Sequence, residues 1–195
     1  MKVYIDKCCV LLIGLALSHP ALAASKDVER AAGAAAGIFA GIYVHELGHA
    51  AADHAAGAEQ IRIRVPGTQC SLLCGETQAA WRVPPTPAQA RTINAAGFIA
   101  SNLAAELMLQ HESSARSGFG QGFIATNLYS NAAHVFTYYT KVRGRNGYRG
   151  NDIDAYELSG GNPHLLSAGL IAYSVYTLHR ARKKEIPILF MRVPF

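Results

Sequence analysis

The sequence predicts a mainly α-helical protein, a bundle of about four main helices with a small β-hairpin after the first of them. Three observations predict this fold class. Half of the 195 residues are hydrophobic and only 16% are charged, which is enough apolar material for one domain with a sizeable core. Long apolar segments rich in Ala and Gly are separated by clusters of Pro, Gly and Ser. One short stretch alternates apolar and charged residues as a strand does.

The first main helix is expected over residues 25–56, with Gly57 ending it. Gly33, Gly37 and Gly41 recur every four residues and form a smooth face along which another helix could approach closely. Such a face suits either a contact between membrane-embedded helices or the core of a soluble protein.

A small hairpin is expected after this helix. Residues 61–65 alternate Ile or Val with Arg, the pattern of a strand with one solvated face. Pro66-Gly67 would turn the chain, and residues 79–83 would return as a second strand around Trp81. The edge of this hairpin could hold an extended peptide through main-chain hydrogen bonds, or the hairpin could simply cover the helix.

The rest of the chain is expected to be helical. Long helices are predicted over residues 87–111, 123–141 and 163–182, and a short one over 153–158. A Gly/Ser-rich break at 113–122 and a loop at 142–151 are predicted to connect them. The net charge is +5, but the basic residues are scattered and not interleaved with aromatic ones, so nucleic-acid binding is not predicted.

The N-terminus has the pattern of a secretory signal peptide over residues 1–23, which leaves a single domain at 24–195. Lys2 and Lys7 precede a short apolar core, and Ala21-Leu22-Ala23 matches the small-x-small cleavage pattern. An uncleaved membrane anchor is the alternative. The protein is therefore expected to be exported, in the periplasm or associated with the inner membrane.

Cysteine usage agrees with export. Cys70 and Cys74 are the two cysteines outside the signal segment, and a disulfide between them is expected. Two free thiols, or a zinc site with further ligands, are the alternatives.

The main functional signal is His45-Glu46-Leu47-Gly48-His49 within the first helix. Residues four apart share one face of a helix, so both imidazoles can bind one metal ion. Zinc takes nitrogen and carboxylate ligands, and a catalytic zinc keeps one position open for water. Glu46 lies one step around the helix, where its carboxylate can polarise that water. A solvated polar patch on a surface helix is the alternative interpretation.

A third ligand has to come from elsewhere in the chain. Asp152 is preferred to Asp154, because capping of the short helix by Asn151 would give Asp154 an ordinary role in the first turn. The remaining candidates are Glu106, His111 and His134. His134 could instead stabilise a developing oxyanion. Asp53 lies too far along the first helix to complete the site, and is expected to be a partner of an imidazole or a solvated charge.

The segment 44–50, the following Ala55-Ala56-Gly57-Ala58 and the strand at 61–65 resemble the gluzincin-like zinc metalloproteases, particularly the site-2 protease group of membrane metalloproteases. Ala96-Gly97-Phe98 with Asn102 is loosely similar to the second helical motif of that group. The resemblance implies that His45 and His49 are zinc ligands and that Glu46 is the general base.

The sequence also departs from this pattern. The Leu-Asp-Gly-Gly phrase that carries the group's third ligand is absent, and Asn151-Asp152-Ile153-Asp154 is the nearest substitute. The third His of the metzincins would fall at Ala55, and His54 is one position short of it.

The sequence thus predicts a zinc-dependent peptidase that hydrolyses peptide bonds with metal-activated water and Glu46 as general base. The expected ligands are His45, His49 and Asp152, and the expected substrate is a peptide or protein, with membrane association possible. The alternative is a non-catalytic exported or membrane helical protein, in which the motif is structural or accidental.

Overall fold

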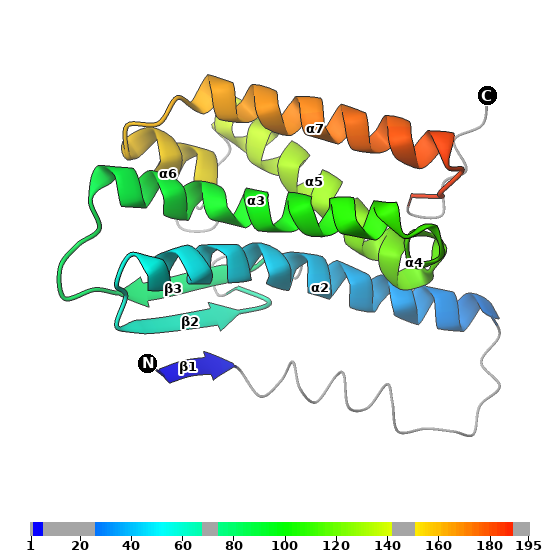
Figure 1. Ribbon diagram of the computed structural model, residues 1–195, viewed down its shortest axis with the longest axis horizontal. Helices are drawn as coiled ribbons and strands as arrows, with labels where there is room; N and C mark the ends of the chain where they lie inside the picture. The colour runs from blue at the N-terminus through cyan, green and yellow to red at the C-terminus, as the bar shows by residue number, and fades with distance from the viewer. Residues whose placement is uncertain (1, 6–25, 68–73, 142–150, 189–195) are drawn as a thin grey trace.

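The computed structural model describes residues 2–5, 26–67, 74–141 and 151–188, and it confirms the predicted fold class. Four long helices form a bundle, and a small sheet lies beside the first of them (Figure 1). The long helices are α2 (Lys26–Ala55), α3 (Pro87–Gln110), α5 (Gly118–Thr140) and α7 (Pro163–Lys183), and the short ones are α4 (Glu112–Arg116) and α6 (Asp152–Leu158).

The sheet has three strands in the order β1-β2-β3. β2 (Gln60–Arg64) and β3 (Glu76–Ala80) form the predicted antiparallel hairpin, with Ile61 opposite Ala79 and Ile63 opposite Thr77. β1 (Lys2–Ile5) adds a parallel strand beside β2. β1 belongs to the segment for which the sequence predicts cleavage, and that cleavage stays a prediction.

The second hairpin strand begins three residues earlier than residues 79–83 would suggest. The register with β2 continues toward the turn as far as Arg64 opposite Glu76, and the amide of Gly67 donates to the carbonyl of Cys74 beyond it. Cys74 is disulfide-bonded, while Cys70 lies outside the described residues. The pairing of β3 with β2 therefore begins at Glu76, next to the turn.

The predicted break at 113–122 is wrong, because these residues form α4 and the first turn of α5. The Ser117 side chain caps α5 by accepting from the amide of Gly120. The glycines here allow a close helix contact: a Cβ on Gly118 would lie 2.2 Å from the Arg30 carbonyl oxygen, and one on Gly122 would lie 2.0 Å from that of Ala34.

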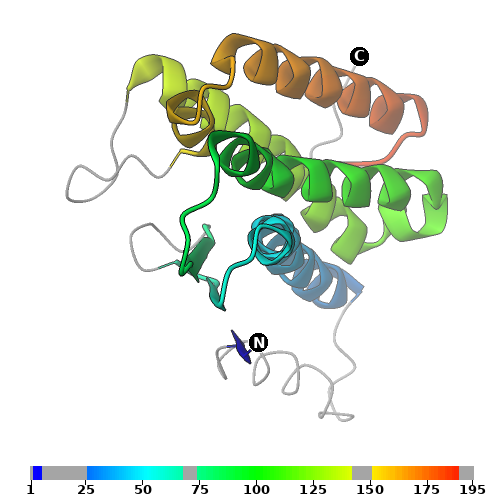
Figure 2. The ribbon, with the colours of Figure 1, turned by 60° about the vertical axis from the view of Figure 1, so that its left-hand side comes forward.

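The glycine face of α2 packs against α5, as its spacing predicts. A Cβ on Gly37 would lie 2.0 Å from the carbonyl oxygen of Phe119, and one on Gly41 would lie 3.1 Å from the Thr126 side chain. α2 also packs along α3, so it is held between two helices on one side and the hairpin on another (Figures 1 and 2). The helix that carries the metal-type motif therefore lies between the hairpin and the helices α3 and α5.

Helix boundaries follow the expected local signals. Gly57, with φ +93°, ends α2. Thr86 and Gln89 form a capping box at the start of α3, and the Asn162 side chain accepts from two amides at the start of α7. Asn151 caps α6 by accepting from the amide of Ile153. This last cap fixes the direction in which α6 leaves the loop and presents its first side chains.

Candidate metal centre

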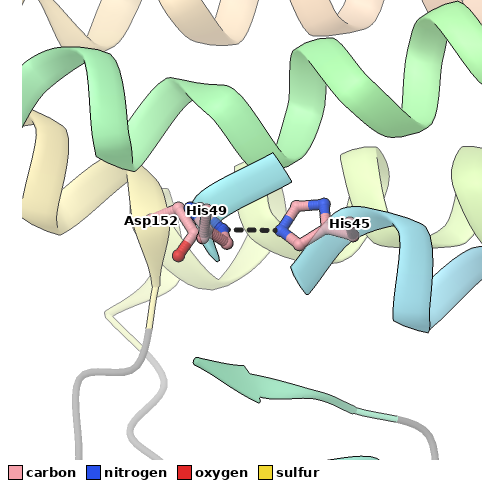
Figure 3. A group of neighbouring side chains, drawn as sticks. All are labelled: His45, His49 and Asp152. Atoms are coloured by element: carbon pink, nitrogen blue, oxygen red, sulfur yellow. Dashed lines mark hydrogen bonds and ion pairs between the residues drawn. The ribbon is translucent and has the colours of Figure 1, made fainter. Parts of the chain in front are cut away.

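Three side chains from two helices converge at one point of the fold. His45 and His49 lie one turn apart on α2, and Asp152 is the first residue of α6. Nε2 of His45 lies 2.9 Å from Oδ2 of Asp152, and Nε2 of His49 lies 3.2 Å from the same oxygen. The two Nε2 atoms are 3.1 Å apart. Figure 3 shows the three side chains meeting between the helices, and together they form a group that could hold a metal ion.

The other ring nitrogen of His49 shows which atom of this imidazole carries the lone pair. Nδ1 lies 2.7 Å from the carbonyl oxygen of Ile93 on α3. A carbonyl only accepts, so Nδ1 bears the hydrogen and the lone pair of the neutral ring is on Nε2. Burial lowers the pKa of His49, but the Asp152 carboxylate raises it further, to about 9, so at neutral pH this Nε2 bears a proton that a metal ion would have to displace. A metal cation in that place would stabilise the arrangement of the two imidazoles and the carboxylate.

The spacing of these atoms fits zinc. Ligands at about 2.0 to 2.1 Å from a tetrahedral zinc ion lie roughly 3.4 Å from one another. The three distances within the cluster, 2.9, 3.1 and 3.2 Å, are close to that value. The donor set of two imidazoles and one carboxylate is also one that zinc uses in catalytic sites.

Asp152 is suited to be an anionic ligand. Burial raises the pKa of its carboxyl, but the charge of His49 and the hydrogen bonds with both imidazoles outweigh burial and hold the pKa well below its usual range. Asp154, the other candidate on α6, pairs with Lys141 at 3.3 Å instead. The structure therefore brings Asp152 to the imidazoles and places Asp154 in a separate ion pair.

The other sequence candidates lie in different surroundings. Glu106 forms an ion pair with Arg180 of α7, and His111 follows the end of α3 as its C-cap. His134 of α5 does come close: its Nε2 lies 3.7 Å from Oδ2 of Asp152, and its ring centroid lies 5.6 Å from that of His45. His134 thus borders the cluster, next to its carboxylate.

Glu46 lies beside the cluster and is held by the hairpin. It is buried, and its carboxylate is close enough to interact electrostatically with both imidazoles and with Asp152. The hydroxyl of Thr77 on β3 donates to Glu46 Oε2 at 2.7 Å. Gly75 packs directly on this side chain, because a Cβ there would lie 2.3 Å from Glu46 Cγ. The hairpin therefore fixes the carboxylate that the motif places next to the two imidazoles.

Packing, in addition to the contact of its Nε2 with Asp152, orients His45. Its Nδ1 is buried and has no hydrogen-bond partner in the part of the chain that the structure describes. The ring packs edge-on against Phe98, with centroids 5.2 Å apart, and Phe98 contacts His134 in the same way at 4.9 Å. Phe98 is almost fully buried and belongs to an apolar cluster with Ile153 of α6. This apolar cluster packs against one side of the imidazoles.

Gly97 leaves the space in which the imidazoles meet. A Cβ at this position of α3 would lie 2.4 Å from His49 Nε2 and 2.6 Å from His45 Nε2. A side chain at this position would occupy the volume between the two Nε2 atoms. The requirement is steric, since Gly97 lies within a regular helix.

We expect Gly97→Ala to lower zinc affinity by about 10- to 100-fold, the size of effect that follows from disturbing ligand orientation. Isothermal titration calorimetry of the metal-free protein with zinc measures the change. Gly169→Ala on α7 is the matched control, because nothing lies within 4 Å of a Cβ built there. Equal affinities in both variants would contradict the assignment of Gly97.

Asp53 is neither solvated nor a hydrogen-bond partner of an imidazole. It is buried, and its Oδ1 has no hydrogen-bond partner among the described residues. Burial raises its pKa to about 6, against the opposing influence of His49. The Nδ1 of His49, the imidazole one turn before it on α2, donates to the Ile93 carbonyl instead.

Sequence reasoning did not single out the residues that support the cluster. Ile93 contributes a backbone carbonyl, which no side-chain pattern marks, and Thr77 reaches Glu46 only because of the hairpin register. Gly97 did carry a signal, as part of the Ala96-Gly97-Phe98 stretch.

Comparison of the chain with protein-family models, with curated proteins and with solved structures finds no match. What the centre can do is therefore decided by its own geometry.

Proposed function

We propose that this chain is a zinc-dependent peptidase in which His45, His49 and Asp152 hold the metal. The observation that carries the proposal is the orientation of His49. Its Nδ1 is committed to the Ile93 carbonyl, so its Nε2 is directed at the Asp152 carboxylate and at the second imidazole of the motif. Three ligands leave the fourth position of a tetrahedral zinc for a water or a substrate.

Each group then has a chemical role. Zinc supplies a Lewis acid that polarises a carbonyl group and makes a water molecule far more acidic. Glu46 accepts a proton from the attacking water as the oxygen forms a bond to the carbonyl carbon of the substrate. Glu46 then delivers that proton to the amide nitrogen, and the carbon–nitrogen bond breaks to give a carboxylate and an amine. Thr77 holds the Glu46 carboxylate in place for both transfers.

The hairpin favours an extended peptide as substrate. β3 is hydrogen-bonded to β2 along one edge, and no described strand pairs with its other edge. A peptide added along that edge would use main-chain hydrogen bonds, as in other cases of strand addition. Because Thr77 of β3 contacts Glu46, a peptide bound there would pass close to the general base.

Removal and return of the metal tests the proposal. We expect the purified chain to cleave members of a mixture of unstructured peptides, seen as new termini by mass spectrometry. Treatment with 1,10-phenanthroline should abolish the new termini, and addition of zinc should restore them. A chelator analogue that does not bind zinc, 1,7-phenanthroline, is the control for the reagent itself.

The competing function is a structural metal site without catalysis, and one observation favours it. His134 lies 3.7 Å from the Asp152 oxygen and could act as a fourth ligand that closes the site. Such a site would contribute folding energy only. Loss of thermal stability on chelation, with no cleavage of any peptide before or after zinc addition, would support it and contradict the peptidase. Glu46 has no use in a closed site, which is why the peptidase is the conclusion.

A further inference from the structure

Asn151 makes more contacts than the capping of α6 requires. The residue is buried, with 7% of its surface exposed, and both polar atoms of its side-chain amide have partners. Oδ1 accepts from the amide of Ile153, which is the helix cap. Nδ2 donates to the backbone carbonyl of His134 and to the hydroxyl oxygen of Thr137, both at 2.7 Å. These two acceptors belong to α5, so one side chain joins the start of α6 to another helix.

The partners of this amide determine its orientation. The Thr137 hydroxyl donates to the carbonyl of Ala133, one turn earlier on α5, so its oxygen is left to accept. A half-turn of the Asn151 amide would put Oδ1 against a carbonyl oxygen and a hydroxyl that already donates elsewhere. It would also put Nδ2 against the amide of Ile153, so none of the three contacts would be a hydrogen bond. Both hydrogens of Nδ2 therefore point to α5.

The docked amide lies next to the carboxylate of the metal centre. Asp152 directly follows Asn151, and its Oδ2 lies 2.9 Å from His45 Nε2 and 3.2 Å from His49 Nε2. His134, whose backbone carbonyl binds the amide, has its ring Nε2 3.7 Å from the same oxygen. Groups that act together at a site have to be held within about 0.5 Å of the productive geometry. The contact between Asn151 and α5 therefore sets the position of the carboxylate.

The rest of α6 is attached to the bundle by other contacts. At its far end, Arg91 and Asn94 of α3 donate to the carbonyl and the hydroxyl of Ser159, at 2.9 and 3.1 Å. Within α6, Ile153 is fully buried in an apolar cluster. These contacts do not involve the amide of Asn151. Loss of that amide would therefore leave α6 attached to the bundle, with its first turn free to shift.

We propose that Asn151 is a positioning residue of the metal centre: its Nδ2 group docks the first turn of α6 on α5 and so sets the Asp152 carboxylate against the two imidazoles. Residues that orient a metal ligand typically contribute 10- to 100-fold to metal affinity. This role rests on the proposed function for the presence of zinc, but it does not depend on peptide cleavage.

Asn151→Ser separates docking from capping. Serine is about as good as asparagine at a helix N-cap, but its hydroxyl ends one bond short of the amide nitrogen and does not reach both acceptors on α5. Thr137→Val removes one acceptor from the other side of the same contact and keeps the branched shape of the side chain. Asn162→Ser is the matched control, because Asn162 caps α7 through its Oδ1 in the same way but is exposed.

Zinc affinity of the full-length, metal-free variants, measured by competition with a chelator, is the first test. We expect Asn151→Ser to bind zinc about 10- to 100-fold more weakly than the wild type, and Thr137→Val to be weakened less. Asn162→Ser should bind as the wild type does. The double variant of Asn151→Ser and Thr137→Val should bind no more weakly than Asn151→Ser alone, because both remove the same contact. The visible spectrum of bound Co²⁺, which reports coordination geometry, should change in Asn151→Ser and not in Asn162→Ser.

Hydrogen exchange of the metal-free chain is the second test. The amides of residues 152–158 should exchange faster in Asn151→Ser than in the wild type or in Asn162→Ser, because the start of α6 has lost its attachment to α5. Circular dichroism identifies any variant that has not folded, and Thr137→Val then carries both tests.

Two results would overturn the positioning role: equal zinc affinities in Asn151→Ser and Asn162→Ser, or unchanged exchange of the α6 amides. A wild-type chain that binds no zinc would overturn this role together with the proposed function. A wild-type chain that binds zinc but cleaves no peptide would contradict the peptidase alone, and weaker zinc binding by Asn151→Ser would then still support the positioning role. The two proposals can therefore fail separately.

Discussion

Replacing Glu46 with Gln should reduce peptide cleavage by about 10²- to 10⁴-fold, the usual contribution of a general acid–base group. Glutamine keeps the size of the side chain and can still interact with the Thr77 hydroxyl, but it cannot accept a proton from water. Zinc content should stay at the wild-type level, because Glu46 is not one of the three converging ligands. Cleavage rates and metal content by mass spectrometry, measured on the same preparation, check both statements.

The control for this substitution is Glu112→Gln at the start of α4. Glu112 pairs with Arg116 on the protein surface, and it lies on a different element from the metal centre. We expect it to cleave peptides at the wild-type rate. A Glu46→Gln variant that retains full activity would rule out the proposed base. One that loses its zinc would instead make Glu46 part of the metal-binding set.

Replacing Asp152 with Ala should weaken zinc binding by more than about 100-fold. Loss of a supporting residue typically costs 10- to 100-fold in metal affinity, and Asp152 supplies a ligand atom itself. The remaining two imidazoles would hold the ion only loosely. Competition with a chromogenic zinc chelator measures the affinity, and peptide cleavage should fall with zinc occupancy.

Asp154→Ala is the matched control for Asp152. Both residues lie in the first turn of α6, so both variants lose one favourable charge at the helix N-terminus. Only Asp152 reaches the imidazoles, whereas Asp154 pairs with Lys141. If the two variants bind zinc equally well, or lose it equally, Asp152 is not the third ligand.

The sequence predicted the helices and the two-His motif because both depend on local patterns. Periodicity, caps and glycine spacing located α2 and α3 to within a residue or two at each end, and the motif spacing alone put His45 and His49 on one face. The start of α5 was missed for an equally physical reason. In the sequence alone, Gly118 and Gly122 look like helix breakers. In the folded bundle they lie within α5 and allow it to approach α2 closely.

Long-range contacts set the limit of what could be predicted at the candidate site. Asp152 could be preferred over Asp154 by eliminating the one with a simpler role, and the geometry brings Asp152 to the imidazoles. The partners of His49 and Glu46 depend on how α3 and the hairpin pack on α2. No sequence pattern identifies which backbone carbonyl will face His49 or which strand residue will face Glu46. Asp53 was misjudged because exposure, too, is decided by tertiary packing.

The wide spacing of the ligands along the chain has a consequence for biosynthesis. Asp152 follows His49 by 103 residues, so a nascent chain on the ribosome carries both imidazoles long before the carboxylate exists. Two imidazoles alone bind zinc weakly, and the third ligand arrives only when α6 docks against the earlier helices. If the centre holds zinc as proposed, the ion would bind firmly only after the whole fold is complete, and an incompletely translated chain would not yet cleave neighbouring proteins.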